Sequence, residues 1–370
     1  MREANEMGNP RRTGMSVIIP VRGRVDLLRN LLISLQQARK ECAEATEILV
    51  VDDSCPADAR EHRQHCHECD AKYLRGPRRV GAKRNLGARN AAYEHLVFVD
   101  SDCEIDVNYL ARIGKTLREA SSDVGGIAGP VQMVGNETST LRLLRKTQEL
   151  NQPFGWPTEY EQITWSACAN LAVRADAFWQ IGGFAENALT VVGGEDVDLG
   201  IRLTKAGHMI RCDPKAIVYH SRATGDTVAS VTRRLFTYGR SANWLNCQHP
   251  ERRRFRLNPV STLACITSIS AAASVTAGAV SLSAVPMVAA ALLVWHVKQR
   301  ILPGDRMVDI IGAVVSTAVD WSFDLGEFVG AFQIGRPHYM FSRFGFTDTQ
   351  TFRVRSAVRE PSESHHDGSA

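Results

Sequence analysis

The triplet Asp100-Ser101-Asp102 has the residue types and spacing of a divalent-cation site. It directly follows the apolar run LVFV at residues 96–99. Two carboxylates one residue apart on a tight loop can share a cation, and that cation can bridge phosphate oxygens. Asp-x-Asp triplets also occur in solvated turns and at helix N-caps, so the preceding strand matters to the interpretation. The triplet predicts a site for a metal ion and a phosphate-bearing ligand.

Two further acidic pairs have side chains that could take part in binding or catalysis. Asp52-Asp53 ends a second apolar run, EILVV, and a carboxylate there can accept hydrogen bonds from a base N–H or from ribose hydroxyls. Glu195-Asp196 follows Gly193-Gly194. A carboxylate in an apolar cleft can act as the base that removes a proton from an attacking hydroxyl. Both pairs can also be read as turn or helix-capping residues, a role that is compatible with function.

The elements around these acids follow the order of an open α/β sheet. We expect buried strands at residues 16–21, 47–51 and 96–99, and helices at 25–38, 82–95 and 107–120. Further along, we expect strands in 124–134, 166–173 and 217–220, and helices from about Asp176 and over 197–206. Ligands of such sheets collect at the carboxyl ends of the strands, where two of the acidic pairs lie.

With these pieces in place, residues 15–245 resemble the family 2 glycosyltransferases, which have the GT-A fold. The matching segments occur in the family's order: SVIIPVRGRVDLLRNLLISL, EILVVDDS, GAKRNLGARNAA, LVFVDSD, ANLAVRADAFWQIGGFAE, GGEDVDLGIRLTKAG and VYH. The resemblance implies sugar transfer with inversion from a UDP- or GDP-type nucleotide-sugar, assisted by Mg²⁺ or Mn²⁺. The Gln-x-x-Arg-Trp signature of processive members is missing from TRRLFTYGRSANWL, which favours transfer of a single sugar.

The resemblance also implies a role for each matching residue. The donor would be bound by Pro20, Asp52, Asp53, Arg84, Asp100 and Ser101. The metal ligands would be Asp102, Asp100 and His220. The catalytic base would be Asp196, with Glu195 as its neighbour. Arg233 and Arg234 can offer charge to the departing diphosphate, or lie on a solvated or membrane-facing helix.

The composition changes beyond residue 258. No Asp, Glu, Lys or Arg occurs from 260 to 297, a length that accommodates two short helices folded as a hairpin with its turn near Pro286 or the serines at 281 and 283. Arg252–Arg254 precede this segment, and Lys298 follows it, so the positive-inside rule places both ends in the cytoplasm. We therefore predict a membrane hairpin over 258–302, with a buried soluble helix pair as the alternative. Residues 303–356 look amphipathic and interfacial.

Bulk properties set the remaining limits. The chain has 370 residues and a net charge of +4, too small to imply a nucleic-acid partner. Its polar start predicts no secretory signal and a disordered segment over 1–14, and the polar end predicts a disordered tail over 357–370. We expect the nine cysteines to be free thiols in a reducing cytosol. The predicted fold is thus α/β, with a nucleotide-sugar-binding domain over 15–250 and a C-terminal helical, membrane-associated region.

Two other functions fit parts of the sequence. A nucleotidyltransferase acting on sugar phosphates also uses an α/β sheet and acidic metal ligands, but it needs a Gly-rich basic loop after the first strand. Residues 20–24, PVRGR, resemble such a loop only loosely, and the pair at 195–196 would have no duty. An inert, membrane-anchored sugar-binding protein would not need Asp100, Asp102 and Asp196 together. The acceptor of the transferase, whether lipid-linked, a peptide or a small metabolite, has no signature in the sequence.

Overall fold

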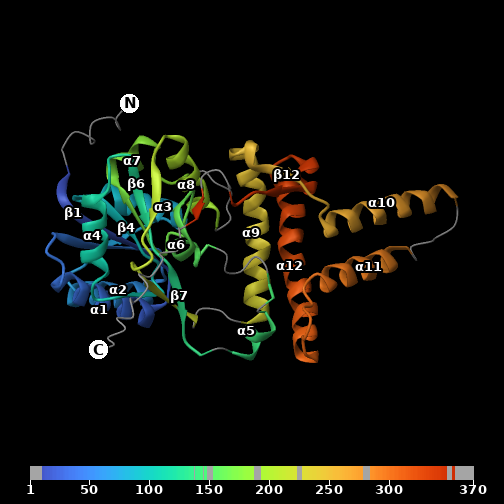
Figure 1. The fold of residues 1–370 in the computed structure, drawn as a ribbon, viewed down its shortest axis with the longest axis horizontal. Helices are drawn as coiled ribbons and strands as arrows, with labels where there is room; N and C mark the ends of the chain where they lie inside the picture. The colour runs from blue at the N-terminus through green and yellow to red at the C-terminus, as the bar shows by residue number, and fades with distance from the viewer. Residues whose placement is uncertain are drawn as a thin grey trace, which may run out of the picture.

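The fold is built on a nine-stranded sheet with the strand order β14-β8-β10-β6-β9-β4-β1-β2-β3 (Figure 1). The structure is a computed structural model that describes residues 11–136, 138–144, 146–147, 153–186, 193–222, 227–277, 284–347 and 352–354. The strands of this sheet are β1 (Arg12–Val21), β2 (Thr46–Asp52), β3 (Lys72–Arg75), β4 (Tyr93–Phe98), β6 (Val124–Ala128), β8 (Tyr160–Ile163), β9 (Leu171–Arg174), β10 (Met209–Cys212) and β14 (Arg353–Val354). β1 pairs in parallel with β2 and β4, which confirms the predicted α/β core.

Both faces of the sheet are apolar, because helices cover both. Successive residues of a strand point to opposite faces, so Val17 and Ile19 belong to one hydrophobic cluster and Ile18 to the other. The first cluster contains the leucine stripe of α1 (Val25–Lys40) and the apolar face of α4 (Tyr109–Glu119). The second contains buried residues of α3 (Val80–Arg89), α7 (Ala175–Gln180) and α8 (Glu195–Lys205). α2 (Pro56–Glu68) lies beside α1.

A small second sheet brings a distant segment to the Asp100–Asp102 loop. Its strands are β5 (Cys103–Ile105), β11 (Val218–Ser221) and β7 (Val131–Val134). β5 and β11 are antiparallel, with Cys103 opposite His220. Residues more than one hundred positions apart in the chain therefore share one loop region, and the strand expected over 124–134 is two strands in two different sheets.

Several predicted boundaries were wrong. The helix expected over 82–95 ends at Arg89, because Asn90 terminates it and the chain turns into β4, which begins at Tyr93 rather than Leu96. Residues 12–14, expected to be disordered, open β1: the Arg12 amide donates to the Ala92 carbonyl over 3.1 Å. The predicted tail over 357–370 lies outside the described residues.

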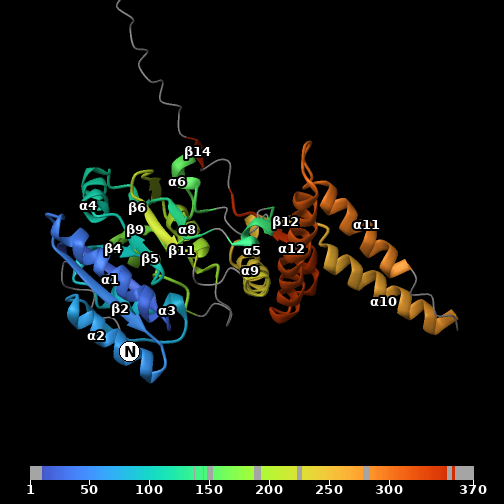
Figure 2. The same ribbon diagram turned by 90° about the horizontal axis from the view of Figure 1, so that it is seen from below.

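After the sheet domain, two long helices run side by side (Figures 1 and 2). α9 (Val228–Gln248) and α12 (Met307–Gln333) approach closely at glycines: a Cβ on Gly239 would lie 2.0 Å from the Phe323 carbonyl oxygen. The short elements α5 (Ser139–Leu143), α6 (Trp156–Glu159), β12 (Arg253–Phe255) and β13 (Ser342–Phe344) complete the described regular structure, with 3₁₀ turns at Pro250–Arg252 and Pro337–Phe341. The chain then returns to the sheet, where β14 pairs with β8.

The apolar segment forms the predicted pair of helices. α10 (Pro259–Ala277) and α11 (Ala284–Lys298) project from α12 away from the sheet domain (Figure 2). Pro286 lies in the first turn of α11, and the serines at 281 and 283 lie outside the described residues. Across the part of the chain that the structure describes, no helix combines the length and the apolar character needed to cross a bilayer.

Candidate active site

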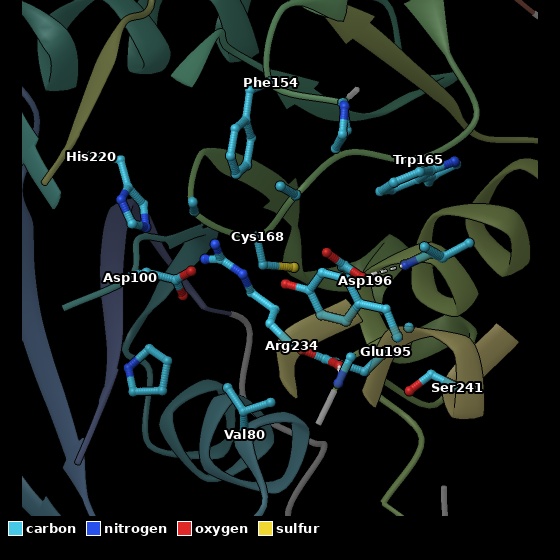
Figure 3. A pocket seen from close by; sticks show the side chains of 18 of the residues that line it. Val80, Asp100, Phe154, Trp165, Cys168, Glu195, Asp196, His220, Arg234 and Ser241 are labelled. Carbon is cyan, nitrogen blue, oxygen red and sulfur yellow. Dashed lines mark hydrogen bonds between the residues drawn. The ribbon is translucent and has the colours of Figure 1, made fainter. Parts of the chain in front are cut away.

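A cavity of about 760 Å³ opens at the carboxyl ends of β1 and β4. It contains most of the residues that the sequence singled out: Pro20, Arg84, Asp100, Ser101, Glu195, Asp196, His220 and Arg234. Asp100 and His220 lie on one side of it, and Asp196, Glu195 and Ser241 on the other, with Phe154 and Trp165 beyond (Figure 3). Asp52, Asp53 and Asp102 are not among its lining residues.

Arg84 joins the two acidic ends of the cavity. Its side chain is only 4% exposed and donates to Asp100 Oδ1 over 2.8 Å and to Glu195 Oε1 over 2.9 Å. Burial by itself lowers the pKa of Arg84, but the surrounding negative groups, Asp100 and Glu195 among them, hold that pKa above its ordinary value. A buried cation with two carboxylate partners holds both of them in place. Arg84 therefore fixes the loop after β4 relative to the start of α8.

Asp196 stands in the first turn of α8 and faces the cavity. Burial, and then the neighbouring charge of Glu195, raise the pKa of Asp196 to about 7. Arg84 and the hydrogen bond from the Val197 amide, at 2.9 Å, oppose this rise. A carboxyl group that exchanges its proton near neutral pH is suited to general-base chemistry. The glycines at 193 and 194 both have positive φ, so the backbone turns sharply into this helix.

The Asp52-Asp53 pair does not line the cavity, but Asp53 contacts residues that do. Asp52 is fully buried and accepts hydrogen bonds from the Tyr73 hydroxyl at 2.8 Å and the Ser54 amide at 2.6 Å. Despite its burial, these bonds and the contact with His62 hold the pKa of Asp52 well below its usual range. Asp53 pairs with Lys83 at 2.6 Å, and Lys83 lines the cavity. His62 of α2 thus packs against Asp52, with its Nδ1 3.3 Å from Asp52 Oδ2.

Asp102 and His220 can hold a divalent cation. Asp102 Oδ2 is 3.4 Å from His220 Nε2, and Cys103 completes a group whose ligand atoms all lie within 4.8 Å of one another. His220 Nδ1 lies 3.1 Å from the Ser221 carbonyl, to which it can donate only if it carries the proton. That tautomer leaves a lone pair on Nε2, directed at Asp102. Asp102 and His220, two of the three predicted ligands, therefore fit a metal ion, whereas the third, Asp100, pairs with Arg84 and is not in this group.

The far wall of the cavity comes from the C-terminal helices. Of the two arginines that the sequence connected with the diphosphate, Arg234 lines this wall and Arg233 does not line the cavity. α9 supplies Arg234, Tyr238, Ser241 and Leu245, and α12 supplies Phe323. The segment after β13 adds Phe346, whose carbonyl accepts a hydrogen bond from Trp165 Nε1 at 2.7 Å. Ser241 Oγ likewise donates to the Thr237 carbonyl at 3.1 Å. The wall thus combines apolar side chains with the charge of Arg234 and the hydroxyl of Tyr238.

Comparison with known proteins agrees with this geometry. The family model described as "Glycosyl transferase family 2" matches residues 16–182. The pre-mycofactocin glycosyltransferase of Mycobacterium tuberculosis (strain H37Rv) is 30% identical over 253 residues, which cover 66% of this chain and 50% of that protein. This chain thus spans about half the length of that relative. An N-acetylglucosaminyl-diphospho-decaprenol L-rhamnosyltransferase of the same organism is 41% identical over 86 residues, covering 20% of this chain and 27% of its own.

Among solved structures, the mannosyltransferase PcManGT from Pyrobaculum calidifontis, in complex with GDP-Man and Mn²⁺, gives a TM-score of 0.48 at 17% identity, covering 85% of this chain and 91% of its own. The chain carries a family 2 glycosyltransferase domain over residues 16–182. The matched range contains Asp52, Arg84 and the Asp100–Asp102 triplet but ends before Glu195, Asp196 and His220. The fold brings those three residues to the cavity, although they lie outside the matched range.

Proposed function

We propose that this protein transfers a single sugar, with inversion, from a nucleoside diphosphate sugar of the UDP or GDP type to an acceptor hydroxyl. The observation that carries the proposal is the position of Asp196. Its carboxyl group, with a pKa raised to about 7, faces the same cavity as Asp100 and His220, which lie across from it. The side with Asp100 and His220 is suited to binding a phosphorylated donor, and the side with Asp196 is suited to removing a proton from the acceptor.

In this reaction the diphosphate would lie toward the Asp100–Asp102 loop, where Arg22, Arg24 and Arg78 line the cavity. Asp102, Asp100 and His220 would hold Mg²⁺ or Mn²⁺, which neutralises charge on the departing diphosphate. Asp196 accepts the proton of the acceptor hydroxyl as its oxygen forms a bond to the anomeric carbon and the bond to the diphosphate oxygen breaks on the opposite face. Glu195, fixed by Arg84, keeps Asp196 basic by charge repulsion.

The acceptor side of the cavity favours a molecule with an apolar portion. Trp165, Leu245 and Phe323 line the cavity there, each no more than 6% exposed. A lipid-linked acceptor, a peptide or a small metabolite with an apolar part meets this condition. The two alternatives from the sequence gain no support: a nucleotidyltransferase leaves Asp196 without a duty, and an inert binding protein does not need a carboxyl group with a pKa near neutrality.

The hairpin α10–α11 supports a location at the cytoplasmic face of a membrane. Ile269 is 69% exposed, Met287 73% and Trp295 56%, so the described part of the pair presents large apolar side chains to its surroundings. Arg254 and Lys298 stand at its two ends, where cations meet anionic headgroups. We place the catalytic domain in the cytoplasm, with the hairpin in contact with the bilayer.

The test of the reaction is a screen of nucleotide-sugars with purified protein and Mn²⁺ or Mg²⁺, in which slow hydrolysis of one donor reports activity. Asp196→Asn should bind that donor with unchanged affinity and lose at least a hundredfold in turnover. The matched control is Asp176→Asn: Asp176 also lies in a first helical turn and accepts from the next amide, Ala177, at 2.7 Å, but it is exposed. Equal turnover in Asp196→Asn and wild type would remove Asp196 as the base.

A further inference from the structure

Arg24 has an unfavourable backbone conformation and an unfavourable charge for its place at the start of α1. It is not glycine, yet its φ of 60° and ψ of 42° place it in the left-handed region, directly after Gly23 at φ 63°. It is also the N-cap of α1 and makes no side-chain capping bond. A cation at a helix N-terminus meets the positive end of the helix dipole. Strain of this kind persists where the surrounding structure requires it, and it clusters at functional sites.

The contact that Arg24 makes explains its position. Its Nη1 lies 2.7 Å from Asp102 Oδ2, the same oxygen that is 3.4 Å from His220 Nε2. The side chain of Asp102 is 3% exposed and that of Arg24 is 42% exposed. Arg24 lines the cavity and Asp102 does not. The guanidinium group therefore lies on the solvent side of the carboxylate, where a cation arriving from the cavity would have to bind.

We propose that Arg24 is an internal counter-ion of Asp102, which a divalent cation displaces when the nucleotide binds. This inference rests on the proposed function. The free protein then holds the metal weakly, because the cation must compete with a charge-assisted hydrogen bond. A nucleoside diphosphate changes the balance by offering its own oxygens both to the metal and to the released guanidinium group. Metal and nucleotide consequently bind with positive coupling, and each raises the affinity of the other by the same factor.

The experiment measures free Mn²⁺ by electron paramagnetic resonance during titration of the purified full chain, alone and with saturating UDP or GDP. Wild type should bind Mn²⁺ weakly alone and at least tenfold more tightly with its preferred nucleotide. Arg24→Gln should bind Mn²⁺ alone about tenfold more tightly than wild type, a change of about 1.4 kcal/mol. Its additional gain from nucleotide should shrink, because the competing cation is absent and the diphosphate loses one contact.

A second variant of Arg24 and a matched control at Arg22 complete the experiment. Arg24→Gly removes the cation and also the strain, because glycine adopts this conformation at little cost, so it should fold and repeat the Arg24→Gln result. Arg22→Gln is the matched control: Arg22 also lines the cavity, but it contacts Asp53, at 3.8 Å, and should leave Mn²⁺ binding without nucleotide as in wild type.

The outcomes separate the two proposals. Folded Arg24→Gln and Arg24→Gly that bind Mn²⁺ alone no better than wild type, while wild type still binds Mn²⁺ with nucleotide, would overturn the counter-ion role and leave the proposed function standing. A wild type that binds neither Mn²⁺ nor nucleotide would overturn both. A wild type that binds nucleotide without Mn²⁺ would overturn the counter-ion role and the metal assignment together.

Discussion

At the scale of single residues, the site depends on a few charges that are held away from water. Arg84, Asp100 and Glu195 form one connected group, and Asp196 stands beside it with a raised pKa. Removal of the central cation would leave these carboxylates facing one another without compensation. The arrangement indicates that the basicity of Asp196 is a property of the whole group.

The pH dependence of the reaction follows from that group. The proposed base, Asp196, can accept a proton only when it is deprotonated, and burial and the charge of Glu195 raise its pKa to about 7. The value of kcat/KM for the donor should therefore rise about tenfold per pH unit below 7 and level off above it. Initial rates between pH 5 and 9 with saturating metal provide the measurement. Glu195→Gln, which removes the neighbouring negative charge, should move the rising limb to lower pH, whereas an unmoved limb would show that another group titrates.

The sequence identified the site residues by type but not by their partners. Asp102 was expected to be the main metal ligand, and the structure places the guanidinium group of Arg24 against it. That contact depends on a left-handed backbone at a non-glycine residue, which local propensity argues against. The contacts of Asp52 with Tyr73 and His62 likewise depend on how β3 and α2 pack, and no local pattern encodes that packing.

At the scale of elements, the junction of α9 and α12 is what makes the far wall of the cavity. A Cβ added to Gly326 would lie 2.2 Å from the Phe236 carbonyl oxygen, so the backbones of the two helices nearly touch. The contact is completed by Asn243 Nδ2, which donates to the Glu327 carbonyl. Small residues permit such an approach, and any side chain at this position must push the helices apart.

We therefore expect Gly326→Val to destabilise the protein by about 3 kcal/mol. The loss of the wall beside Tyr238 and Leu245 should also raise the KM for the acceptor more than that for the donor. The matched control is Ala318→Val, which adds bulk at an exposed position of the same helix. Urea unfolding of the three proteins measures the difference in stability. A Gly326→Val protein as stable as Ala318→Val would contradict the close packing of these helices.

The helices and strands could largely be predicted from the sequence, but the residues that pack against them could not. Apolar periodicity correctly indicated the core strands and helices, because burial on one or both faces leaves a local signature. The acids of α12 illustrate the limit. Asp324 and Glu327 are buried, and Arg256 and Arg343 pair with them, at 2.6 Å from Asp324 and 3.2 Å from Glu327 respectively. These partners come from distant segments, so the sequence alone shows charges in an apolar helix without showing what neutralises them.

At the scale of the whole molecule, the helices α9 and α12 lie between the sheet domain and the hairpin α10–α11 (Figure 2). Both helices contribute to a wall of the cavity, and α12 also packs against α10 and α11 of the hairpin. Any surface that the hairpin binds is thus joined to the acceptor side of the site by two packed helices. The proposed membrane contact of the hairpin would therefore place a membrane surface on the acceptor side of the cavity.

Binding to vesicles tests that arrangement directly. The full chain should sediment with vesicles that contain anionic phospholipid, and it should bind less tightly as salt rises, because Arg254, Lys298 and their basic neighbours contribute about 1 kcal/mol each near a negative surface. Trp295→Glu should weaken binding about tenfold or more, because it replaces a large apolar side chain, 56% exposed, with a charge. Ile33→Glu, at an apolar position of α1 that is 38% exposed, is the matched control and should bind as wild type does. Equal binding of the two variants would show that the hairpin does not contact the bilayer.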